Sequence, residues 1–268
     1  MNDLKDKVIV LSGATGTLGS TLAESFMQKG AKLVLLGRNK RLLDESVAHL
    51  TSIHKEVIAF TVDVLNREAL EAIALKVLDR FQTVDVLVNA VGGNMPGATV
   101  SDDQSIFDLS LPDFDAVMDL NLKGTLIPSL VFGKIMGDKR KGAIVNYSSM
   151  VVDRALTRVV GYSAGKAAME NFTRWMAVEM ALKFGDGVRV NAIAPGFFIA
   201  KQNKRLLLKE DGNLTERGQK IITNTPMRRF GKPEELNGVI HFLCSDHASF
   251  ITGTVICVDG GFNAFSGV

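Results

Sequence analysis

Short runs of apolar residues alternate along the chain with longer segments in which apolar residues recur every three or four positions. The short runs predict seven strands, at 8–11, 32–36, 57–60, 84–88, 143–146, 188–193 and 254–258. The longer segments predict helices at about 18–29, 41–50, 66–81, 112–136, 162–184 and 233–244. Consecutive strands are therefore separated by a helix throughout.

The predicted strands are continuously apolar, which is typical of strands buried on both faces. Strands that alternate with helices form parallel sheets. We therefore expect an α/β fold in a single domain over residues 1–268, a Rossmann-like doubly wound parallel sheet of about seven strands with helices on both faces. Two connections, at about 90–111 and 195–225, are long for loops without function. They begin at the carboxyl ends of strands, where such sheets bind ligands, so they are the candidate substrate-loop segments.

Composition narrows the range of partners. The chain has 268 residues and a net charge of +2, which predicts neither nucleic acid nor an anionic membrane as a partner. The two cysteines, Cys244 and Cys257, form no disulfide framework and no zinc-ligand spacing, so we expect no metal. The start is too polar for a signal peptide, and no apolar run approaches the ~18 residues of a membrane span. We therefore expect a cytoplasmic protein.

A glycine-rich turn joins the first predicted strand to the first predicted helix. Gly13, Gly16 and Gly19 allow the backbone to turn tightly and to approach a pyrophosphate, while the helix N-terminus offers free N–H groups to the anion. A glycine-rich turn without a ligand is the alternative. The position between strand and helix favours dinucleotide binding.

The ends of the second and third strands carry further candidates for cofactor binding. Proteins that bind NAD usually place an acidic residue after the second strand, whereas this chain has Gly37 followed by Arg38. Arg38 is suited to the 2′-phosphate of NADP, and a solvated arginine at a helix start is the alternative. Asp63 can accept a hydrogen bond from the adenine amine, or it simply precedes the next helix.

A tyrosine and a lysine lie four residues apart on one predicted helix face, as Tyr162 and Lys166. A phenol has a pKa of about 10, and a neighbouring cation favours phenolate and lowers that value. Ser149 ends the fifth predicted strand, where its hydroxyl can hold a substrate oxygen beside the phenol. A helix-surface pair without chemistry is the alternative.

Seven motifs, taken in order and at their spacing, resemble the short-chain dehydrogenase/reductase family. They lie at residues 12–19, 87–92, 121–124, 146–149, 162–166, 194–196 and 258–261. The resemblance implies that Tyr162 is the acid/base, that Lys166 lowers its pKa and binds the nicotinamide ribose, and that Ser149 orients the substrate oxygen. Asn121 is implied to support a proton relay through water.

The same resemblance implies NAD or NADP as the cofactor and a homotetramer as the assembly. The expected cofactor-binding residues are Gly13, Thr15, Gly16, Thr17, Leu18, Gly19, Arg38, Asp63, Val64, Asn89, Gly92, Tyr162, Lys166, Pro195 and Gly196. The chain departs from the family pattern at Thr17, where the middle glycine of the turn usually stands, and at Ala200, where a threonine usually contacts the carboxamide. Residues 89–92 also differ from the usual Asn-Asn-Ala-Gly.

Within the family, residues 92–94, 175–178, 194–203, 225–234 and 258–268 resemble the D-mannonate oxidoreductase (fructuronate reductase) group. This implies hydride transfer between the nicotinamide and a sugar acid, D-fructuronate or D-mannonate. A sugar acid needs a cation for its carboxylate and polar groups for its hydroxyls. The candidate substrate-binding residues are Asn94, Ser149, Arg158, Lys201 and Asn203.

Three other functions remain open at this point. Another polyol or sugar-acid dehydrogenase, of the gluconate 5-dehydrogenase type, would use the same catalytic residues and differ only in the pocket. A dinucleotide-binding regulator without catalysis would use the same fold. An epimerase or lyase would use the nicotinamide only transiently.

Overall fold

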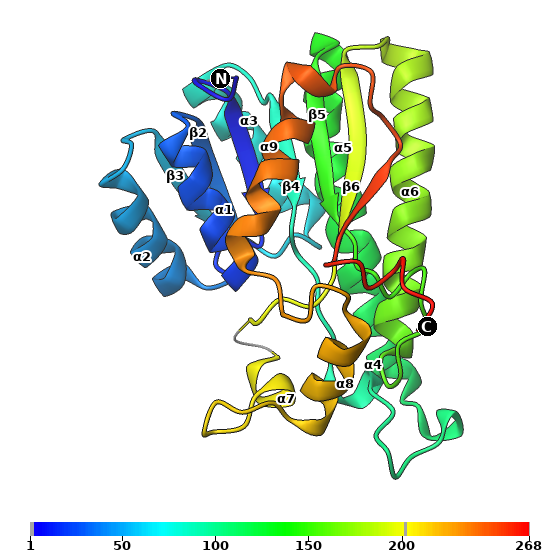
Figure 1. Cartoon of the computed structure of the whole chain (residues 1–268). Coiled ribbons are helices and arrows are strands. Elements are labelled where there is room, and N and C mark those ends of the chain that lie inside the picture. Colours follow the sequence, from blue (N-terminus) through cyan, green and yellow to red (C-terminus); the bar gives the residue numbers. More distant parts are fainter. Residues whose placement is uncertain (1–2, 201–202, 268) are drawn as a thin grey trace.

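One parallel sheet organises the chain. The computed structural model describes residues 3–200 and 203–267. The sheet has seven strands in the order β3-β2-β1-β4-β5-β6-β7, and all neighbours pair in parallel (Figure 1). The strands are Val8–Ser12 (β1), Lys32–Gly37 (β2), Val57–Thr61 (β3), Val86–Asn89 (β4), Gly142–Tyr147 (β5), Val188–Pro195 (β6) and Val255–Val258 (β7). The predicted fold class is therefore confirmed.

Nine α-helices are described. They are Thr17–Gln28 (α1), Lys40–Thr51 (α2), Arg67–Phe81 (α3), Leu111–Met118 (α4), Gly124–Lys139 (α5), Val160–Phe184 (α6), Lys204–Leu207 (α7), Glu216–Asn224 (α8) and Asn237–Cys244 (α9). The predicted N-cap of α3 is confirmed, since the Asn66 side chain accepts a hydrogen bond from the Ala69 N–H at 3.0 Å. None of the helices in the described ranges meets the length and hydropathy needed to cross a membrane.

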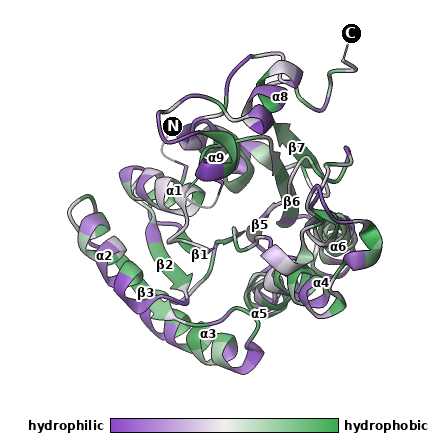
Figure 2. Ribbon diagram, turned by 90° about the horizontal axis from the view of Figure 1, so that it is seen from below, coloured by the Kyte–Doolittle hydropathy of each residue, from purple (hydrophilic) through white to green (hydrophobic). Residues whose placement is uncertain are grey.

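Two hydrophobic layers enclose the sheet. Side chains alternate between the faces of a strand, so Ile9 and Leu11 of β1 pack on one layer while Val8 and Val10 pack on the other. Helices α1, α2 and α9 supply the first layer, and α3, α5 and α6 supply the second. Figure 2 shows α1 and α9 on one side of the sheet and α3 and α5 on the other. This double burial explains why the strands are continuously apolar.

The helix predicted at 112–136 consists of three consecutive helical segments. A π-helical turn at Asp119–Lys123 joins α4 to α5. Such turns are rare and occur often at functional sites. Asn121, at the centre of the turn, is fully buried, and its Nδ2 donates to the Val117 carbonyl at 2.8 Å. Periodicity alone gave no sign of this turn.

The two long connections lie at the carboxyl ends of the strands, at the lower end of Figure 1. The segment at 90–111 holds two short 3₁₀ turns, at Pro96–Ala98 and Ile106–Asp108. The segment at 195–225 holds α7 and α8, which the periodicity analysis did not predict because both are short. Thr215 caps α8 by accepting a hydrogen bond from the Gly218 N–H at 3.0 Å.

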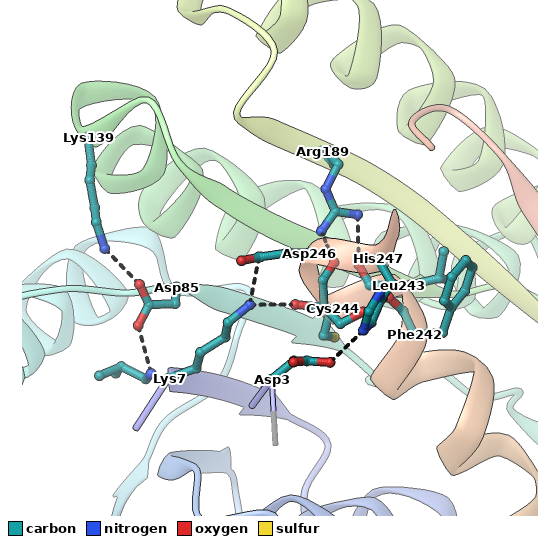
Figure 3. Close-up of polar contacts among 12 residues, drawn as sticks. Asp3, Lys7, Asp85, Lys139, Arg189, Phe242, Leu243, Cys244, Asp246 and His247 are labelled. Atoms are coloured by element: carbon teal, nitrogen blue, oxygen red, sulfur yellow. Dashed lines mark hydrogen bonds and ion pairs between the residues drawn. The ribbon is translucent and has the colours of Figure 1, made fainter. Parts of the chain in front are cut away.

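A buried arginine joins β6 to the end of α9 near the amino ends of the strands, away from the two long connections (Figure 3). Arg189 is 7% exposed and donates to the carbonyls of Leu243 at 2.8 Å and Ser245 at 2.9 Å. Lys7 donates to the neighbouring Cys244 carbonyl at 3.2 Å. The last carbonyls of a helix have no partner within the helix, so these cations satisfy them.

We expect Arg189→Met to lower the free energy of unfolding by about 2–4 kcal/mol, because two buried carbonyls lose their donors. Urea unfolding followed by circular dichroism measures this loss. Arg41→Met is the control, since Arg41 is an exposed partner of Glu45 on α2 and its loss costs less than about 1 kcal/mol. Equal effects of the two substitutions would contradict the role assigned to Arg189.

Candidate active site

The glycine turn after β1 leaves no room for a side chain at Gly13 or Gly19. Gly13 has a φ of +72°, and a Cβ there would lie 2.6 Å from the Ala90 carbonyl oxygen. A Cβ on Gly19 would lie 2.2 Å from the Gly13 oxygen. Gly16 precedes α1 and supplies no side-chain cap, and the first turn of α1 holds no acidic residue. The turn therefore fits a pyrophosphate, whose oxygens can accept hydrogen bonds from the backbone N–H groups at the start of α1.

The end of β2 presents an unpaired cation. Arg38 is exposed and forms no hydrogen bond or ion pair within residues 3–200 and 203–267. Gly37 pairs in register with Thr61 of β3, which places the end of β2 beside the end of β3. Asp63 is exposed, and its carboxylate accepts a hydrogen bond from the Leu65 N–H at 3.0 Å. Val64 is buried, so its side chain can act only by packing.

Asn89 lies in a buried polar network at the end of β4. Its side chain is fully buried, and Nδ2 donates to Ser129 Oγ at 3.0 Å and to Asn146 Oδ1 at 2.9 Å. Asn146 in turn donates to Thr173 Oγ1 at 2.9 Å. The side chain of Asn89 therefore links β4 to β5 and the helices behind them, and its Oδ1 is buried without a partner in the described structure.

Gly92 is the point where three predicted site residues meet. A Cβ on Gly92 would lie 2.8 Å from both Asn121 Oδ1 and Lys166 Nζ. Lys166 is 2% exposed, and its Nζ donates to the Tyr147 carbonyl at 2.6 Å. Asn121 Nδ2 donates to the Gly93 carbonyl at 2.7 Å. Only glycine at position 92 allows this approach.

Tyr162 and Ser149 complete the group. Tyr162 lies in the first turn of α6, and Lys166 Nζ is 5.7 Å from the centroid of its ring. Ser149, just beyond β5, lies near enough to Tyr162 for its hydroxyl to act on the pKa of the phenol. The fold thus brings all four predicted catalytic residues together from three elements: the π turn, the end of β5 and α6.

Burial dominates the protonation of this group. Burial lowers the pKa of Lys166 to about 8, and the negative charge of Glu170 acts against this shift. Burial raises the pKa of the Tyr162 phenol, and the hydrogen bond from Ser149 acts against this shift. The phenol pKa therefore lies above its ordinary value, because desolvation of the phenolate outweighs the effect of Ser149.

Glu170 is a site residue that the sequence analysis missed. It is 1% exposed, and its carboxylate accepts hydrogen bonds from Ser148 Oγ at 2.5 Å and from Arg174 at 2.9 Å. Glu170 follows Lys166 by four positions, so both lie on one face of α6. That spacing was a visible signal of a negative charge held beside the buried ammonium.

The main chain at Pro195 and Gly196 borders the same edge of the sheet. The Pro195 carbonyl accepts a hydrogen bond from the Met150 N–H at 3.3 Å, and a Cβ on Gly196 would lie 2.7 Å from Asp259 Cα. At the glycine turn, Thr15, Thr17 and Leu18 are all half-buried. Their side chains are therefore partly accessible beside the start of α1.

The expected substrate-binding residues have different surroundings. Asn203 has its amide fully engaged, since Nδ2 donates to the Phe198 carbonyl and Oδ1 accepts from the Ala200 N–H, both at 2.8 Å. It therefore shapes the loop before α7 and has little left for a substrate. Asn94 is exposed, and Nδ2 donates to Thr99 Oγ1 at 2.8 Å. Lys201 lies outside the described residues.

Arg158 is the substrate-binding candidate with unused hydrogen-bonding capacity. It lies in the loop between β5 and α6, and its Nε is buried without a partner in the described part of the chain. Arg217 of α8, which the sequence analysis did not single out, donates to Thr157 Oγ1 in the same loop at 3.5 Å. Two arginines from distant segments therefore lie close to the start of α6.

A cavity of about 390 Å³ lies between residues 197–198, residues 225–235 and the turn after β7. Its lining includes Phe197, Thr225, Met227, Arg229 and Asp259. The described lining residues do not include Ser149, Tyr162 or Lys166. Within residues 3–200 and 203–267, no group of three His, Cys, Asp or Glu residues is placed to hold a metal ion.

Comparisons with known proteins agree with this geometry. The family model described as enoyl-(acyl carrier protein) reductase matches residues 13–263. An uncharacterized oxidoreductase of Bacillus subtilis (strain 168), UxuB, is 41% identical over 275 residues, which are 99% of this chain and 98% of that protein.

Two crystal structures are also similar to the chain. A "putative D-Mannonate oxidoreductase" from Haemophilus influenza, with bound NAD, is 38% identical, has a TM-score of 0.93, and the match covers 99% of this chain and 98% of that one. A "putative gluconate dehydrogenase" from Agrobacterium tumefaciens is 26% identical with a TM-score of 0.88, and the match covers 98% of both chains.

The glycine turn accommodates a dinucleotide, a relative carries NAD, and the family model covers most of the chain. The serine, tyrosine and lysine lie together at the carboxyl edge of a Rossmann-like sheet. The chain therefore belongs to the short-chain dehydrogenase/reductase family and is an oxidoreductase that uses NAD or NADP.

Proposed function

We propose that this oxidoreductase interconverts the ketone and the alcohol of a sugar acid, D-fructuronate and D-mannonate. The observation that carries the proposal is the buried, unpartnered Nε of Arg158, four residues before Tyr162. A guanidinium in that place suits the carboxylate that distinguishes a sugar acid from a neutral sugar. The likeness to the Haemophilus influenza protein supports the same choice.

Ser149, Tyr162 and Lys166 have distinct roles in this reaction. When bound, the nicotinamide supplies the hydride for reduction or accepts it in oxidation. Tyr162 gives its proton to the substrate carbonyl oxygen as the alcohol forms, and Ser149 holds that oxygen through its hydroxyl. Lys166 is fixed by the Tyr147 carbonyl at 2.6 Å and places its positive charge beside the phenol, where it favours the phenolate left after proton transfer.

Asn121 has a positioning role in this scheme. Its side chain binds both the N–H and the carbonyl of Gly93, at 3.2 and 2.7 Å. The π turn therefore fixes the start of the 90–111 segment against the catalytic residues. In the family such an asparagine also supports a proton relay, and the position of Asn121 beside Lys166 is compatible with that role.

A dehydrogenase for another polyol or sugar acid, of the gluconate 5-dehydrogenase type, is the second candidate. The likeness to the Agrobacterium tumefaciens protein favours it, although at a lower identity of 26%. It uses the same catalytic group, so only the pocket residues distinguish the two. A regulator without catalysis is disfavoured, because Ser149, Tyr162 and Lys166 are all present and in contact range.

We also propose a homotetramer, for which α6 provides support. Trp175, Val178 and Leu182 are 63%, 59% and 78% exposed and follow one another at helical spacing. Leu130 of α5 is 44% exposed. Large apolar side chains that are exposed together commonly mark an interface between subunits.

We expect Tyr162→Phe to lower kcat with D-fructuronate by roughly 10²–10⁴, because the ring keeps its packing and loses the proton donor. Steady-state assays with NADH and NADPH against a panel of keto-sugar acids measure this loss and rank the substrates. Tyr147→Phe is the matched control, because the chain has only two tyrosines and the Tyr147 hydroxyl is buried without a partner in the described structure. That variant keeps the main-chain carbonyl that binds Lys166.

Near-normal turnover in Tyr162→Phe would overturn the assignment of the proton donor. Wild-type activity confined to other keto acids would overturn the choice of D-fructuronate. Cofactor affinity, measured by fluorescence titration, should stay close to wild type in both tyrosine variants.

We expect Arg38→Ala to raise the Kd for NADPH at least tenfold and to leave the Kd for NADH unchanged. Arg38 is exposed and unpaired in the described structure, and a charge-assisted contact with a 2′-phosphate contributes about 1.5–3 kcal/mol. Arg41→Ala is the control, since Arg41 lies nearby on α2 and pairs with Glu45 at 2.6 Å. Equal losses for both cofactors, or no loss for either, would show that Arg38 does not contact the phosphate.

We expect Glu170→Gln to move the alkaline limb of the kcat/KM profile to lower pH. The Glu170 charge raises the pKa of Lys166, which burial lowers to about 8, so neutralising Glu170 lowers that pKa further. Lys166 then loses its proton at a lower pH. Glu179→Gln, on the same helix and paired with Lys183, should leave the profile in place. An unshifted limb in Glu170→Gln would show that Lys166 does not set it.

A further inference from the structure

Two arginines from separate substrate-loop segments meet beside the start of α6. Arg158 belongs to the loop between β5 and α6, and Arg217 to the first turn of α8. Arg217 donates to Thr157 Oγ1 at 3.5 Å, which brings its guanidinium against the loop that carries Arg158. Burial lowers the pKa of Arg217, and the nearby charge of Arg158 lowers it further. We call Arg158 and Arg217 the arginine pair.

The backbone holds Arg158 in an unfavourable conformation. Its φ is +80°, in the left-handed region that residues other than glycine adopt rarely. The Arg158 carbonyl accepts a hydrogen bond from the Val100 N–H at 3.0 Å, which joins this loop to the 90–111 segment. Strained residues of this kind are concentrated at binding sites, where the surrounding structure maintains them.

Neither arginine of the pair has a counter-ion in direct contact within the described chain. Arg158 Nε is buried without a partner, and neither arginine forms an ion pair within residues 3–200 and 203–267. Asp102 and Asp103 lie near enough to interact with the pair, but Asp103 is engaged by Ser101 Oγ at 2.5 Å. Two like charges, partly withdrawn from water, favour an anion that both can bind.

We infer that Arg158 and Arg217 together bind the carboxylate of the substrate, so that α8 forms part of the substrate site. The inference rests on the proposed function, and it adds Arg217 and α8 to the recognition of the sugar acid. Arg158 lies two residues before α6, and Tyr162 lies in the first turn of α6. One small substrate can therefore place its carboxylate between the arginines and its carbonyl at the phenol.

The arginine pair also explains how the site distinguishes an acid from a neutral sugar. A guanidinium offers paired N–H groups that match the two oxygens of a carboxylate. A hydroxymethyl group in the same place carries no charge and leaves both cations without a counter-ion. The contacts exist in both the ground state and the transition state, so they act on KM more than on kcat.

The test compares the wild-type protein with Arg158→Gln, Arg217→Gln and the double variant. Arg205→Gln is the matched control, because Arg205 is an exposed arginine on α7 in the same segment as Arg217. KM and kcat are measured with D-fructuronate and with D-fructose, which carries a hydroxymethyl group in place of the carboxylate. We expect each single variant to raise KM for D-fructuronate at least tenfold with little change in kcat. The KM and kcat for D-fructose, if it is reduced, should be the same in all four variants as in the wild type.

A binding measurement separates recognition from catalysis. The NADH-bound protein is titrated by calorimetry with D-mannonate and with D-mannitol, neither of which can accept a hydride. Each single variant should bind D-mannonate at least tenfold more weakly and D-mannitol as the wild type does. The double variant should lose less than the product of the two single losses, since both arginines bind one anion.

A third measurement separates recognition from a structural role. In the absence of ligand, Arg217→Gln should not lower Tm, because it removes one of two neighbouring like charges. The rise in Tm that D-mannonate produces in the wild type should be absent from this variant. A lower Tm in the ligand-free variant, with an unchanged Kd for D-mannonate, would show that Arg217 is structural and would overturn the inference.

The outcomes also separate the inference from the proposed function. If the wild type reduces D-fructuronate and Arg217→Gln keeps its KM and Kd, the arginine pair is overturned and the proposed function stands. If the wild type does not reduce D-fructuronate, but binds D-gluconate, D-glucuronate or D-galacturonate in an Arg217-dependent way, the choice of sugar acid is overturned and the pair stands. If no acid depends on either arginine, the pair is overturned whatever the activity.

Discussion

The buried ammonium of Lys166 is the constraint on which the site depends. It is 2% exposed, and its one hydrogen bond among the described residues goes to the Tyr147 carbonyl at 2.6 Å. A charge withdrawn from water must be compensated by nearby dipoles and charges. The carbonyl at the end of β5, the carboxylate of Glu170 and the oxygen of Asn121 surround it. Gly92 leaves the space in which this arrangement forms.

Several unusual features of the fold follow from that constraint. The π turn widens the helix between α4 and α5 and directs Asn121 toward both Gly93 and Lys166. The buried Glu170 carboxylate, which is the negative charge near Lys166, accepts a hydrogen bond from Ser148. This bond joins α6 to the residue that precedes Ser149. Tyr162 shares this low-polarity environment, which keeps its phenol protonated and ready to donate. The π turn, the end of β5 and α6 therefore all meet around the buried ammonium of Lys166.

The local sequence predicted the elements well because strand burial and helix periodicity are local properties. The runs around Val10, Val88 and Val145 predicted buried strands, and Asn66 predicted a helix start. The motifs indicated Ser149, Tyr162 and Lys166 through their resemblance to the short-chain dehydrogenase/reductase family, since the spacing alone is a weak signal. Short helices such as α7 and α8 have too few turns for their apolar residues to show a helical period, so hydrophobic periodicity did not predict them. Asn203 was expected at the substrate, but local loop bonds engage its amide.

The sequence by itself determined the doubly wound sheet, the glycine turn and the identities of the proposed catalytic residues. Only the tertiary structure decided the proton affinities, since burial raises the pKa of Tyr162 and lowers that of Lys166 whatever their spacing. It also decided that Arg217 contacts the loop of Arg158, through a hydrogen bond to Thr157, which lies 60 positions earlier in the chain. Contacts of this kind depend on how connections fold over the carboxyl edge of the sheet. Local periodicity contains no information about that path, because each segment is stabilised by the others and not by its own sequence pattern.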